Sequence, residues 1–216
     1  MFDSDFLSRL ASKALDCYQS DKDDLPGFIR ELALYIMQNS VIDVGEHRYQ
    51  IVETEMYYWS DCHQDIYTHR TTEQGNFCTW YFNGFGLDLT VGNSQYGVEA
   101  GLLIRGVKNI AKNEYFSGPT IVLKELFRAI GNAYAPSNSI ALKAFASAEK
   151  TEIISSVRIG LPQKDIDFRG RPYRYISDLN VAHKFADKYS VIKACLTEEM
   201  DIRIDIQALG YYIRKT

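Results

Sequence analysis

The sequence has 216 residues, of which 46% are hydrophobic and 13% aromatic, so it is long and apolar enough to bury one sizeable core. No apolar run approaches the roughly 20 residues of a membrane span, and the first residues lack the basic start and apolar core of a signal peptide. The formal net charge of −4 argues against nonspecific binding of nucleic acid through an overall positive field. We therefore expect a soluble, cytoplasmic, single-domain protein that spans residues 1–216 and does not enter a membrane.

Charge is unevenly distributed along the chain, which is compatible with one basic face. Acidic residues are frequent in the first 60 positions, whereas a basic run follows later: Arg158, Lys164, Arg169, Arg171 and Arg174. The four cysteines are scattered, without a C-x-x-C pair, which predicts free thiols rather than disulfides or a zinc site.

Two amphipathic helices open the predicted order of elements, over residues 5–18 and 26–39. Residues 40–44 and 48–58 lie on either side of a Gly45–Glu46 turn and predict a β-hairpin. Further strands are predicted over residues 77–82, 87–91, 102–107, 153–161 and 173–176. Further helices are predicted over residues 117–130, 141–148, 181–189 and 204–213. With no internal repeat and no low-complexity linker, this order predicts one mixed α+β domain.

Two carboxylates interrupt the strand Ile51–Tyr57, which otherwise has the composition of a core strand. Side chains alternate along a strand, so Glu53 and Glu55 point to the same face, with Cα atoms roughly 6.5 to 7 Å apart. Arg105 interrupts the apolar run Leu102–Val107 and needs an anionic partner if it is buried. These residues predict either a site where an arginine–glutamate pair holds water or substrate, or a structural ion pair. A third interpretation takes the two glutamates as an acid/base pair that hydrolyses nucleosides or glycosides.

A polar loop follows this strand. Asp61, His63, Asp65 and His69 have metal-ligating side chains, but they lack the spacing of a helical histidine pair, and a solvated loop is the better interpretation. We therefore expect no metal and no cofactor. Aromatic residues between positions 57 and 85 surround these polar groups, a composition that suits either the stacking of a flat ligand or a plain core.

Four segments together resemble the alkyladenine (3-methyladenine) DNA glycosylase family: Ile51–Tyr57, Leu103–Gly106, Ser117–Pro119 and Arg158–Gly160. The first matches six of the seven residues of the family's I-V-E-T-E-A-Y strand, and the four occur in the family's order and rough spacing. The resemblance implies one α+β domain with a curved antiparallel sheet flanked by helices, related to the C-terminal domain of methionyl-tRNA formyltransferase. It implies a glycosylase-like core at residues 46–180 and a divergent helical part at residues 1–45.

The resemblance also implies roles for individual residues. Glu55 matches the general base, which deprotonates a water for attack on the sugar carbon of a flipped nucleotide. Arg105 and the main-chain carbonyl of Ile159 match the groups that hold this water. Tyr57 matches the residue that stacks on the flipped base, and His69 matches a contact to the base edge.

Other positions correspond less closely to the family. Trp80 or Tyr81 is expected to supply the opposite stacking wall, and Asp88 lies nearest to the family's purine-discriminating asparagine. The family's wedge tyrosine, which enters the duplex, has its nearest equivalents in Asn83 and Phe85, each followed by glycine.

These features predict a monofunctional glycosylase that releases alkylated or deaminated purines from damaged DNA, without a lysine nucleophile. The alternative is a noncatalytic nucleic-acid-binding or scaffold domain that keeps the fold. The altered wedge turn, Ile121 in place of the family's phosphate-binding lysine, and the net negative charge favour that alternative. The sequence leaves the oligomeric state open.

Overall fold

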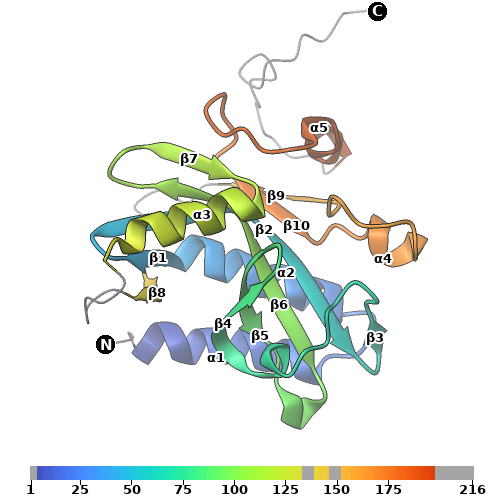
Figure 1. Cartoon of the computed structure of the whole chain (residues 1–216). Helices are drawn as coiled ribbons and strands as arrows, with labels where there is room; N and C mark the ends of the chain where they lie inside the picture. The colour runs from blue at the N-terminus through green and yellow to red at the C-terminus, as the bar shows by residue number, and fades with distance from the viewer. Residues whose placement is uncertain (1–3, 133–138, 146–151, 198–216) are drawn as a thin grey trace, which may run out of the picture.

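A strongly curled antiparallel sheet forms the centre of the protein, with helices packed around it (Figure 1). The computed structural model describes residues 4–132, 139–145 and 152–197. The strands are β1 (Ser40–Val44), β2 (His47–Ser60), β3 (His63–Gln64), β4 (Phe77–Asn83), β5 (Gly86–Val91), β6 (Glu99–Asn109), β7 (Glu114–Ser117), β8 (Ile140–Ala144), β9 (Ile153–Ser156) and β10 (Arg174–Ser177). The main path through the sheet runs β4-β5-β6-β2-β1-β8, while β10 pairs with β2 and with β9. The predicted α+β class with a curved antiparallel sheet is confirmed.

Strand β2 brings the charged residues of the predicted site together. It is 14 residues long and pairs with β6 along one edge. It also pairs with β1 near its start and with β10 further on, where Arg174 lies opposite Glu55. Register shifts between Ile51 and Thr54 mark a β-bulge, which bends the strand between these two pairings. The two glutamates therefore lie at the bend, where β6 and β10 both approach β2.

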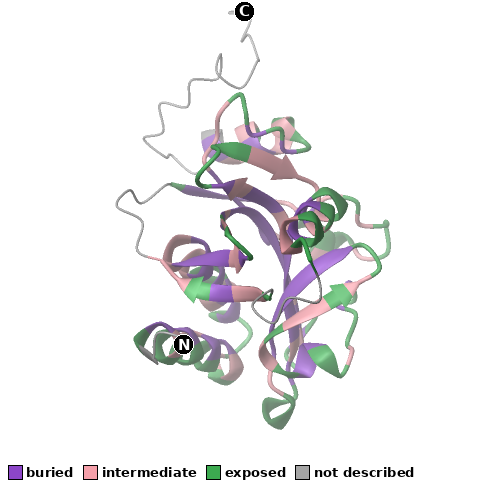
Figure 2. Ribbon diagram, turned by 60° about the vertical axis from the view of Figure 1, so that its left-hand side comes forward, coloured by how far each residue is buried: buried purple, intermediate pink, exposed green. Residues whose placement is uncertain are grey.

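The helices cover different parts of the sheet. Helix α1 (Ser4–Gln19) packs on α2 (Leu25–Asn39), which lies against β1 and β2. Helix α3 (Pro119–Ile130) packs against β5, β6 and β7. The short α4 (Ile166–Gly170) precedes β10, and α5 (Lys188–Thr197) contacts β9; two 3-10 helices, η1 (Glu73–Gly75) and η2 (Ser94–Tyr96), lie in loops. Figure 2 shows that the buried residues concentrate in the central strands.

Two hydrophobic clusters stabilise this arrangement. The larger joins the apolar sides of α1 and α2 to the sheet and includes Val122 and Leu126 of α3. The smaller holds β9, β10 and α5 together through Ile154, Ile176 and Val191. Because full burial of one aliphatic side chain contributes about 1.5–3 kcal/mol, even the smaller cluster is sufficient to anchor the strand that lies beside the glutamates.

The sequence-based prediction is wrong in three segments. Residues 140–144, most of which were expected to be helical, form strand β8, because pairing with β1 satisfies their backbone and buries Leu142. The strand expected over residues 153–161 ends at Ser156. Residues 181–187 are not helical, because the Asn180 side chain accepts from the amides of Ala182 and His183 and holds a turn. The predicted helix 204–213 and residues 146–148 lie outside the described residues.

Two predictions from composition can also be compared with the structure. The cysteines at positions 17, 62, 78 and 195 are free thiols, as their scattered spacing predicts. Within the described ranges, no helix combines the length and the apolar character that crossing a membrane requires.

Candidate active site

Glu55 is the centre of the candidate site, and its side chain is fully buried. Its Oε1 atom accepts a hydrogen bond from the backbone N–H of Ile159 at 2.9 Å. Its Oε2 atom accepts from the Tyr57 hydroxyl at 2.8 Å and from Nη1 of Arg105 at 3.3 Å. Donors from β2, β6 and the loop after β9 therefore converge on one carboxylate, which offsets the cost of burying its charge.

Glu53 is the second buried carboxylate on the same face of β2. Its Oε1 atom accepts from Nε of Arg105 at 3.2 Å and from Nε of Arg174 at 2.9 Å. Arg105 thus bridges both glutamates, which confirms that they point the same way. Strand β6 comes close here because the next residue is Gly106, where a Cβ atom would lie only 2.8 Å from Cβ of Glu53. Held by two arginines, Glu53 fits a structural role better than that of an acid partner to Glu55.

A cavity of about 530 Å³ lies next to Glu55. The three residues that donate to Glu55 all line it. The sequence-predicted candidates among its lining residues are Tyr57, His69, Asn83, Phe85, Asp88, Arg105 and Ile159. Segments that are far apart in the sequence thus line one cavity. The buried carboxylate of Glu55 lies directly behind the residues that form the cavity wall.

The backbone of Ile159 contacts Glu55 directly. Besides the carbonyl to which the resemblance gives the role of holding a water, Ile159 has an N–H group that donates to Glu55. A donor at this position stabilises the carboxylate directly. The loop therefore contributes to the electrostatics of Glu55 as well as to the cavity wall.

The aromatic candidates separate according to the face of β4 on which they lie. The Tyr81 ring lies edge-on to His69, with ring centroids 6.5 Å apart, and so belongs to the cavity side. Its neighbour Trp80 donates from Nε1 to the carbonyl of Ile140 at 3.0 Å and packs against the main hydrophobic cluster. Of the two residues expected to supply the opposite stacking wall, Trp80 therefore faces the core, because side chains alternate along a strand and only one of the two can face the cavity.

A buried ion pair that the sequence did not predict supports this site from behind. Arg158 donates from Nη1 to Oδ2 of Asp65 at 2.6 Å and from Nη2 to Oδ1 at 3.2 Å, and both side chains are completely buried. The same guanidinium donates to the carbonyls of Met56 and Phe168 and lies 4.7 Å from the ring centre of Tyr57. Arg158 therefore joins the strand that carries Glu55 to the loop that carries Ile159.

The basic run in the sequence is consequently not a single surface. Arg158 is buried and pairs with Asp65, and Arg174 is buried and pairs with Glu53, so neither contributes to a basic surface. Lys164 and Arg169 are exposed, and Lys164 lines the main cavity. Arg158 falls within the R-I-G segment and Asp65 within the polar loop, and only the tertiary fold pairs them.

The polar loop does not assemble a metal site. Asp65 is occupied by Arg158, and His63 lies beside the Tyr173 hydroxyl, with Nε2 at 3.3 Å. Burial, together with the nearby positive charge of Arg171, lowers the pKa of His63 to about 4. Asp61 and His69 are exposed. Among the described residues, no group of three or more histidine, cysteine, aspartate or glutamate side chains is arranged to hold a metal ion.

Asp88, on β5, is buried and lines the main cavity. Burial raises its pKa to about 7, and hydrogen bonds from the side chains of Asn83 and Gln74 only partly oppose this shift. The Asn83 amide donates to Oδ1 at 3.1 Å. The carboxyl group is therefore a neutral acid below pH 7 and an acceptor-only group above it.

Replacing Asp88 by asparagine is expected to make stability less dependent on pH. A free aspartate ionises near 3.8 and the folded carboxyl near 7, so between these values the folded chain binds more protons and loses stability as the pH rises. Asparagine does not titrate, so from about pH 4 to about pH 8 the free energy of unfolding should shift by more than about 1 kcal/mol in favour of the variant. Urea titrations at several pH values measure this difference; a constant difference would contradict the raised pKa.

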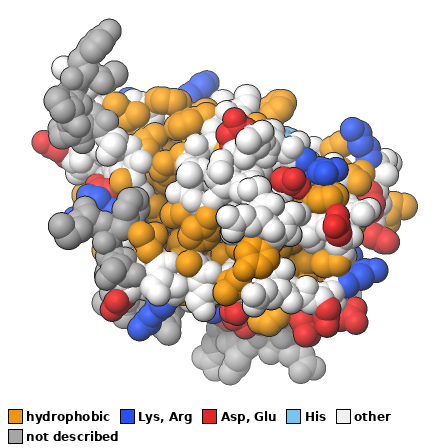
Figure 3. Space-filling model, turned by 90° about the horizontal axis from the view of Figure 1, so that it is seen from below, with side chains coloured by type: hydrophobic (Ala, Val, Ile, Leu, Met, Phe, Trp, Pro, Cys, Tyr) orange, Lys and Arg blue, Asp and Glu red, His pale blue; other side chains and the backbone are white. Residues whose placement is uncertain are grey.

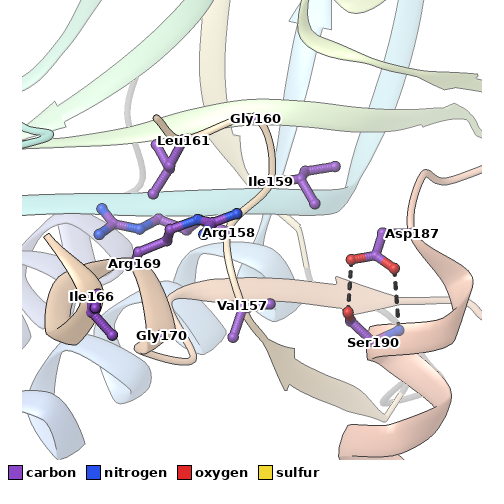
Figure 4. A pocket seen from close by; sticks show the side chains of 10 residues that line it. All are labelled: Val157, Arg158, Ile159, Gly160, Leu161, Ile166, Arg169, Gly170, Asp187 and Ser190. Carbon is purple, nitrogen blue, oxygen red and sulfur yellow. Dashed lines mark hydrogen bonds between the residues drawn. The ribbon is translucent and has the colours of Figure 1, made fainter. Parts of the chain in front are cut away.

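The loop Val157–Leu161 also borders a second cavity of about 410 Å³, shown in Figure 4. Ile159 is the only sequence-predicted candidate that lines it. On its far side, the Ser190 hydroxyl donates to Oδ2 of Asp187 at 2.7 Å, a contact at the start of α5. This cavity lacks the buried carboxylate and the aromatic wall of the first, so the chemistry concentrates in the main cavity.

Comparisons with known proteins give this site no established activity. No family model matches the chain. The chain is 25% identical to an uncharacterized protein of Acanthamoeba polyphaga mimivirus over 194 aligned residues, which cover 73% of this chain and 90% of that protein. Because no activity is attached to that relative, the function is argued from the geometry of the site.

Proposed function

We propose that this protein is a monofunctional N-glycosylase that releases alkylated or deaminated purines from damaged DNA. We also propose that its fold is that of the alkyladenine DNA glycosylase family, related to the C-terminal domain of methionyl-tRNA formyltransferase. One observation carries the proposal: Glu55 is buried beside a cavity and bound by three donors that all line that cavity. A carboxylate in this position is suited to accept a proton from one bound water while bulk water is excluded.

The proposed chemistry uses the acceptor capacity that Glu55 has left. Each carboxylate oxygen has two lone pairs, and Oε1 receives one hydrogen bond, from Ile159, which leaves one lone pair to accept from a water. In the proposed step, Glu55 takes a proton from this water as the water oxygen bonds to C1′ of the flipped nucleotide. The C1′–N bond breaks, and its electron pair leaves with the base. Arg105 remains beside the carboxylate and balances its charge.

The cavity walls suit a flat base. The Tyr57 ring lines the cavity and has the Arg158 guanidinium 4.7 Å from its centre, which fixes its orientation. His69 also lines the cavity, and Tyr81 packs edge-on against His69. Stacking of a base on such a ring contributes about 1–3 kcal/mol. Unstacking a base from a duplex costs a few kcal/mol, so these contacts are of the right size to hold a flipped base.

The wedge is assigned in this proposal to Phe85, at the tip of the β4–β5 hairpin. Phe85 lines the cavity and is 74% exposed, whereas the Asn83 side chain accepts from the amides of Phe85 and Gly86 and so holds the turn. An apolar side chain that enters a base step pays part of the cost of unstacking. Phe85 is therefore suited to the role that the family gives to a tyrosine.

Replacing Phe85 by alanine is expected to lower excision from duplex DNA by about 10-fold or more, since even 1.4 kcal/mol of lost wedge energy has this effect. Excision from single-stranded DNA should change much less, because no base pair has to be opened. Single-turnover rates on both substrates measure the two effects. Equal losses on both would contradict the wedge.

The function itself is tested by single-turnover excision on a panel of duplex and single-stranded oligonucleotides. The panel contains hypoxanthine, 1,N6-ethenoadenine, 3-methyladenine or 7-methylguanine at one site. Abasic product from at least one base, formed at least about 100-fold more slowly with Glu55→Gln, is the expected result. No abasic product from any base would overturn the glycosylase proposal.

Binding without catalysis is the second candidate function, because two observations count against a glycosylase that acts on duplex DNA. Ile121, in the first turn of α3, is 53% exposed and offers no charge to a phosphate. The face seen in Figure 3 carries acidic and basic side chains interspersed rather than one basic field. Tight, salt-sensitive binding of an oligonucleotide without any abasic product would support this candidate.

A further inference from the structure

Large apolar side chains are exposed where the β4–β5 hairpin lies beside α3. Phe82 is 47% exposed, Phe127 52% and Ile121 53%. The hairpin reaches the first turn of α3, where the Thr120 hydroxyl donates to the carbonyl of Phe85 at 3.3 Å (Figure 1). Single exposed apolar residues are common on protein surfaces, but a group of them on two adjacent elements is typical of a binding site.

The same face of α3 also presents a positive charge. At about 100° per residue, Lys124 lies between Ile121 and Phe127 on the helix surface. Lys124 is exposed and has no ion-pair partner among the described residues. Glu125, the only acidic residue of α3, is 5% exposed and bound by Arg128. The exposed residues of the hairpin and the helix form one surface, which we call the α3 strip: Phe82, Ile121, Lys124 and Phe127.

The two phenylalanines of the α3 strip form a rigid stacking surface. Their ring centroids are 5.6 Å apart, and the ring planes make an angle of 30°. Phe82 lies opposite Leu87 in the hairpin, and Phe127 lies on an α-helix, so backbone hydrogen bonds hold both residues in place. Two fixed, half-exposed rings are suited to stacking on nucleic-acid bases, because every base has a flat π-face.

The α3 strip starts close to the main cavity. Phe85 lines that cavity, and its carbonyl is bound by Thr120. From Thr120 to Phe127 the helix rises about 10 Å, which matches roughly three stacked nucleotides of one strand. Tyr81 and Phe82 point to opposite faces of β4, so the cavity and the α3 strip lie on opposite sides of the hairpin. A strand with one base in the cavity can therefore cross the hairpin tip and place neighbouring bases on the strip.

The charges of the two elements favour a polyanion as the occupant. The chain carries a net charge of −4, yet the exposed charged residues of α3 are both basic, Lys124 and Arg128. The only acidic residue of the β4–β5 hairpin, Asp88, is buried. An apolar segment of another protein would gain nothing from an unpaired lysine between two apolar side chains, whereas a nucleic-acid strand places a phosphate beside each base.

We propose that the α3 strip binds unpaired nucleotides next to the damaged base, so that the preferred substrate is single-stranded DNA. Bases within a duplex are stacked on one another and paired, and they offer no free face to the two rings. The inference rests on the proposed function for the damaged base in the cavity. Binding of an unpaired strand by the α3 strip, in contrast, does not depend on excision.

Binding of undamaged oligonucleotides tests the α3 strip without excision. Fluorescence anisotropy compares a single strand with a duplex of the same sequence and length. The wild type should bind the single strand about 10-fold or more tightly than the duplex. Phe82→Ala combined with Phe127→Ala should weaken binding of the single strand by about 10-fold or more, and binding of the duplex by less than about threefold, because only unpaired bases stack on the rings.

Further variants separate stacking from other effects. Phe82→Leu combined with Phe127→Leu keeps apolar bulk for the fold but removes the aromatic faces, so it should weaken single-strand binding as well. Lys124→Gln should reduce the slope of log affinity against log salt concentration by about 0.7, the value for one phosphate contact on a single strand. Tyr189→Ala is the matched control, because it removes a 71% exposed aromatic side chain on α5 and should leave the affinity unchanged. Circular dichroism checks the fold of each variant.

Excision adds a readout that a merely structural role would not reproduce. On single-stranded DNA with a damaged base, the leucine double variant should raise the protein concentration for a half-maximal single-turnover rate by about 10-fold. The rate at saturating protein should stay within about twofold of the wild type, because neither ring contacts the reacting atoms. A loss confined to the saturating rate would contradict a role in binding.

The outcomes separate this inference from the proposed function. A single-strand affinity that stays within about threefold in both double variants, or a duplex bound as tightly as the single strand, overturns the inference while Glu55-dependent excision stands. Wild type that sediments as a dimer, with a monomeric leucine double variant, overturns it too, since the strip then binds a second copy. A single-strand preference that depends on the two phenylalanines, without excision, supports the α3 strip as a nucleic-acid surface and overturns the glycosylase.

Discussion

Replacing Glu55 by glutamine is expected to lower the rate constant of base release by about 10²- to 10⁴-fold, the usual contribution of a general base. Glutamine has nearly the same shape but cannot take a proton from water at neutral pH. It can still accept from the Ile159 amide at the position where Oε1 does so now, at 2.9 Å. Its amide nitrogen then faces Nη1 of Arg105, which should cost some stability. The fold and the affinity for DNA should be kept, and the loss of rate should lie in the chemical step. Single-turnover excision and circular dichroism of the same preparation measure the two effects.

Two control variants separate an effect on the chemical step from an effect on the stability of the fold. Tyr57→Phe removes the hydroxyl that donates to Glu55 but keeps the stacking ring, so its effect on the rate should be about 10-fold or more, the size of one hydrogen bond to a charged group. Glu53→Gln should act mainly on stability, because Arg105 and Arg174 lose a buried carboxylate partner. A Glu55→Gln protein that keeps more than one tenth of the wild-type rate would exclude Glu55 as the base.

The sequence predicted those parts of the site that depend on local periodicity. Alternation along one strand was sufficient to put Glu53 and Glu55 on the same face, and the isolated charge of Arg105 in an apolar run was sufficient to predict an anionic partner. It did not decide between Trp80 and Tyr81, because the face toward the cavity depends on which side of β4 packs on the main hydrophobic cluster. Which of two adjacent strand residues faces the cavity is decided by the tertiary contacts of the strand.

The parts that the sequence did not predict depend on contacts between distant segments. Residues 140–144 have an apolar composition that suits a helix as well as a strand, and only the free edge of β1 makes them a strand. Arg158 and Asp65 are 93 positions apart; Asp65 occurs in a polar loop, whereas Arg158 lies between Val157 and Ile159. Their burial follows from the closure of the loop after β9 against β2, which no local pattern encodes.

Breaking the Arg158–Asp65 pair is expected to have the largest effect on stability. Arg158→Met leaves Asp65 as a buried charge without its partner, and the loss of one member of a buried pair costs about 3–5 kcal/mol. As a control, Lys13→Met removes the partly exposed ion pair of Lys13 with Glu31, which should cost no more than about 1 kcal/mol. Urea unfolding of both variants compares the two costs. Equal, small losses would mean that Asp65 finds another partner or water.

The double replacement Arg158→Met with Asp65→Leu distinguishes stability from positioning. It removes both buried charges, so the free energy of unfolding should recover by a large part of the loss in Arg158→Met. Base release should not recover with it, because the hydrogen bonds from Arg158 to the carbonyls of Met56 and Phe168 are still missing. These contacts fix the loop whose Ile159 amide binds Glu55. A double variant that regained both stability and rate would show that the pair only fills the interior, whereas recovery of stability alone makes Arg158 a positioning residue for the general base.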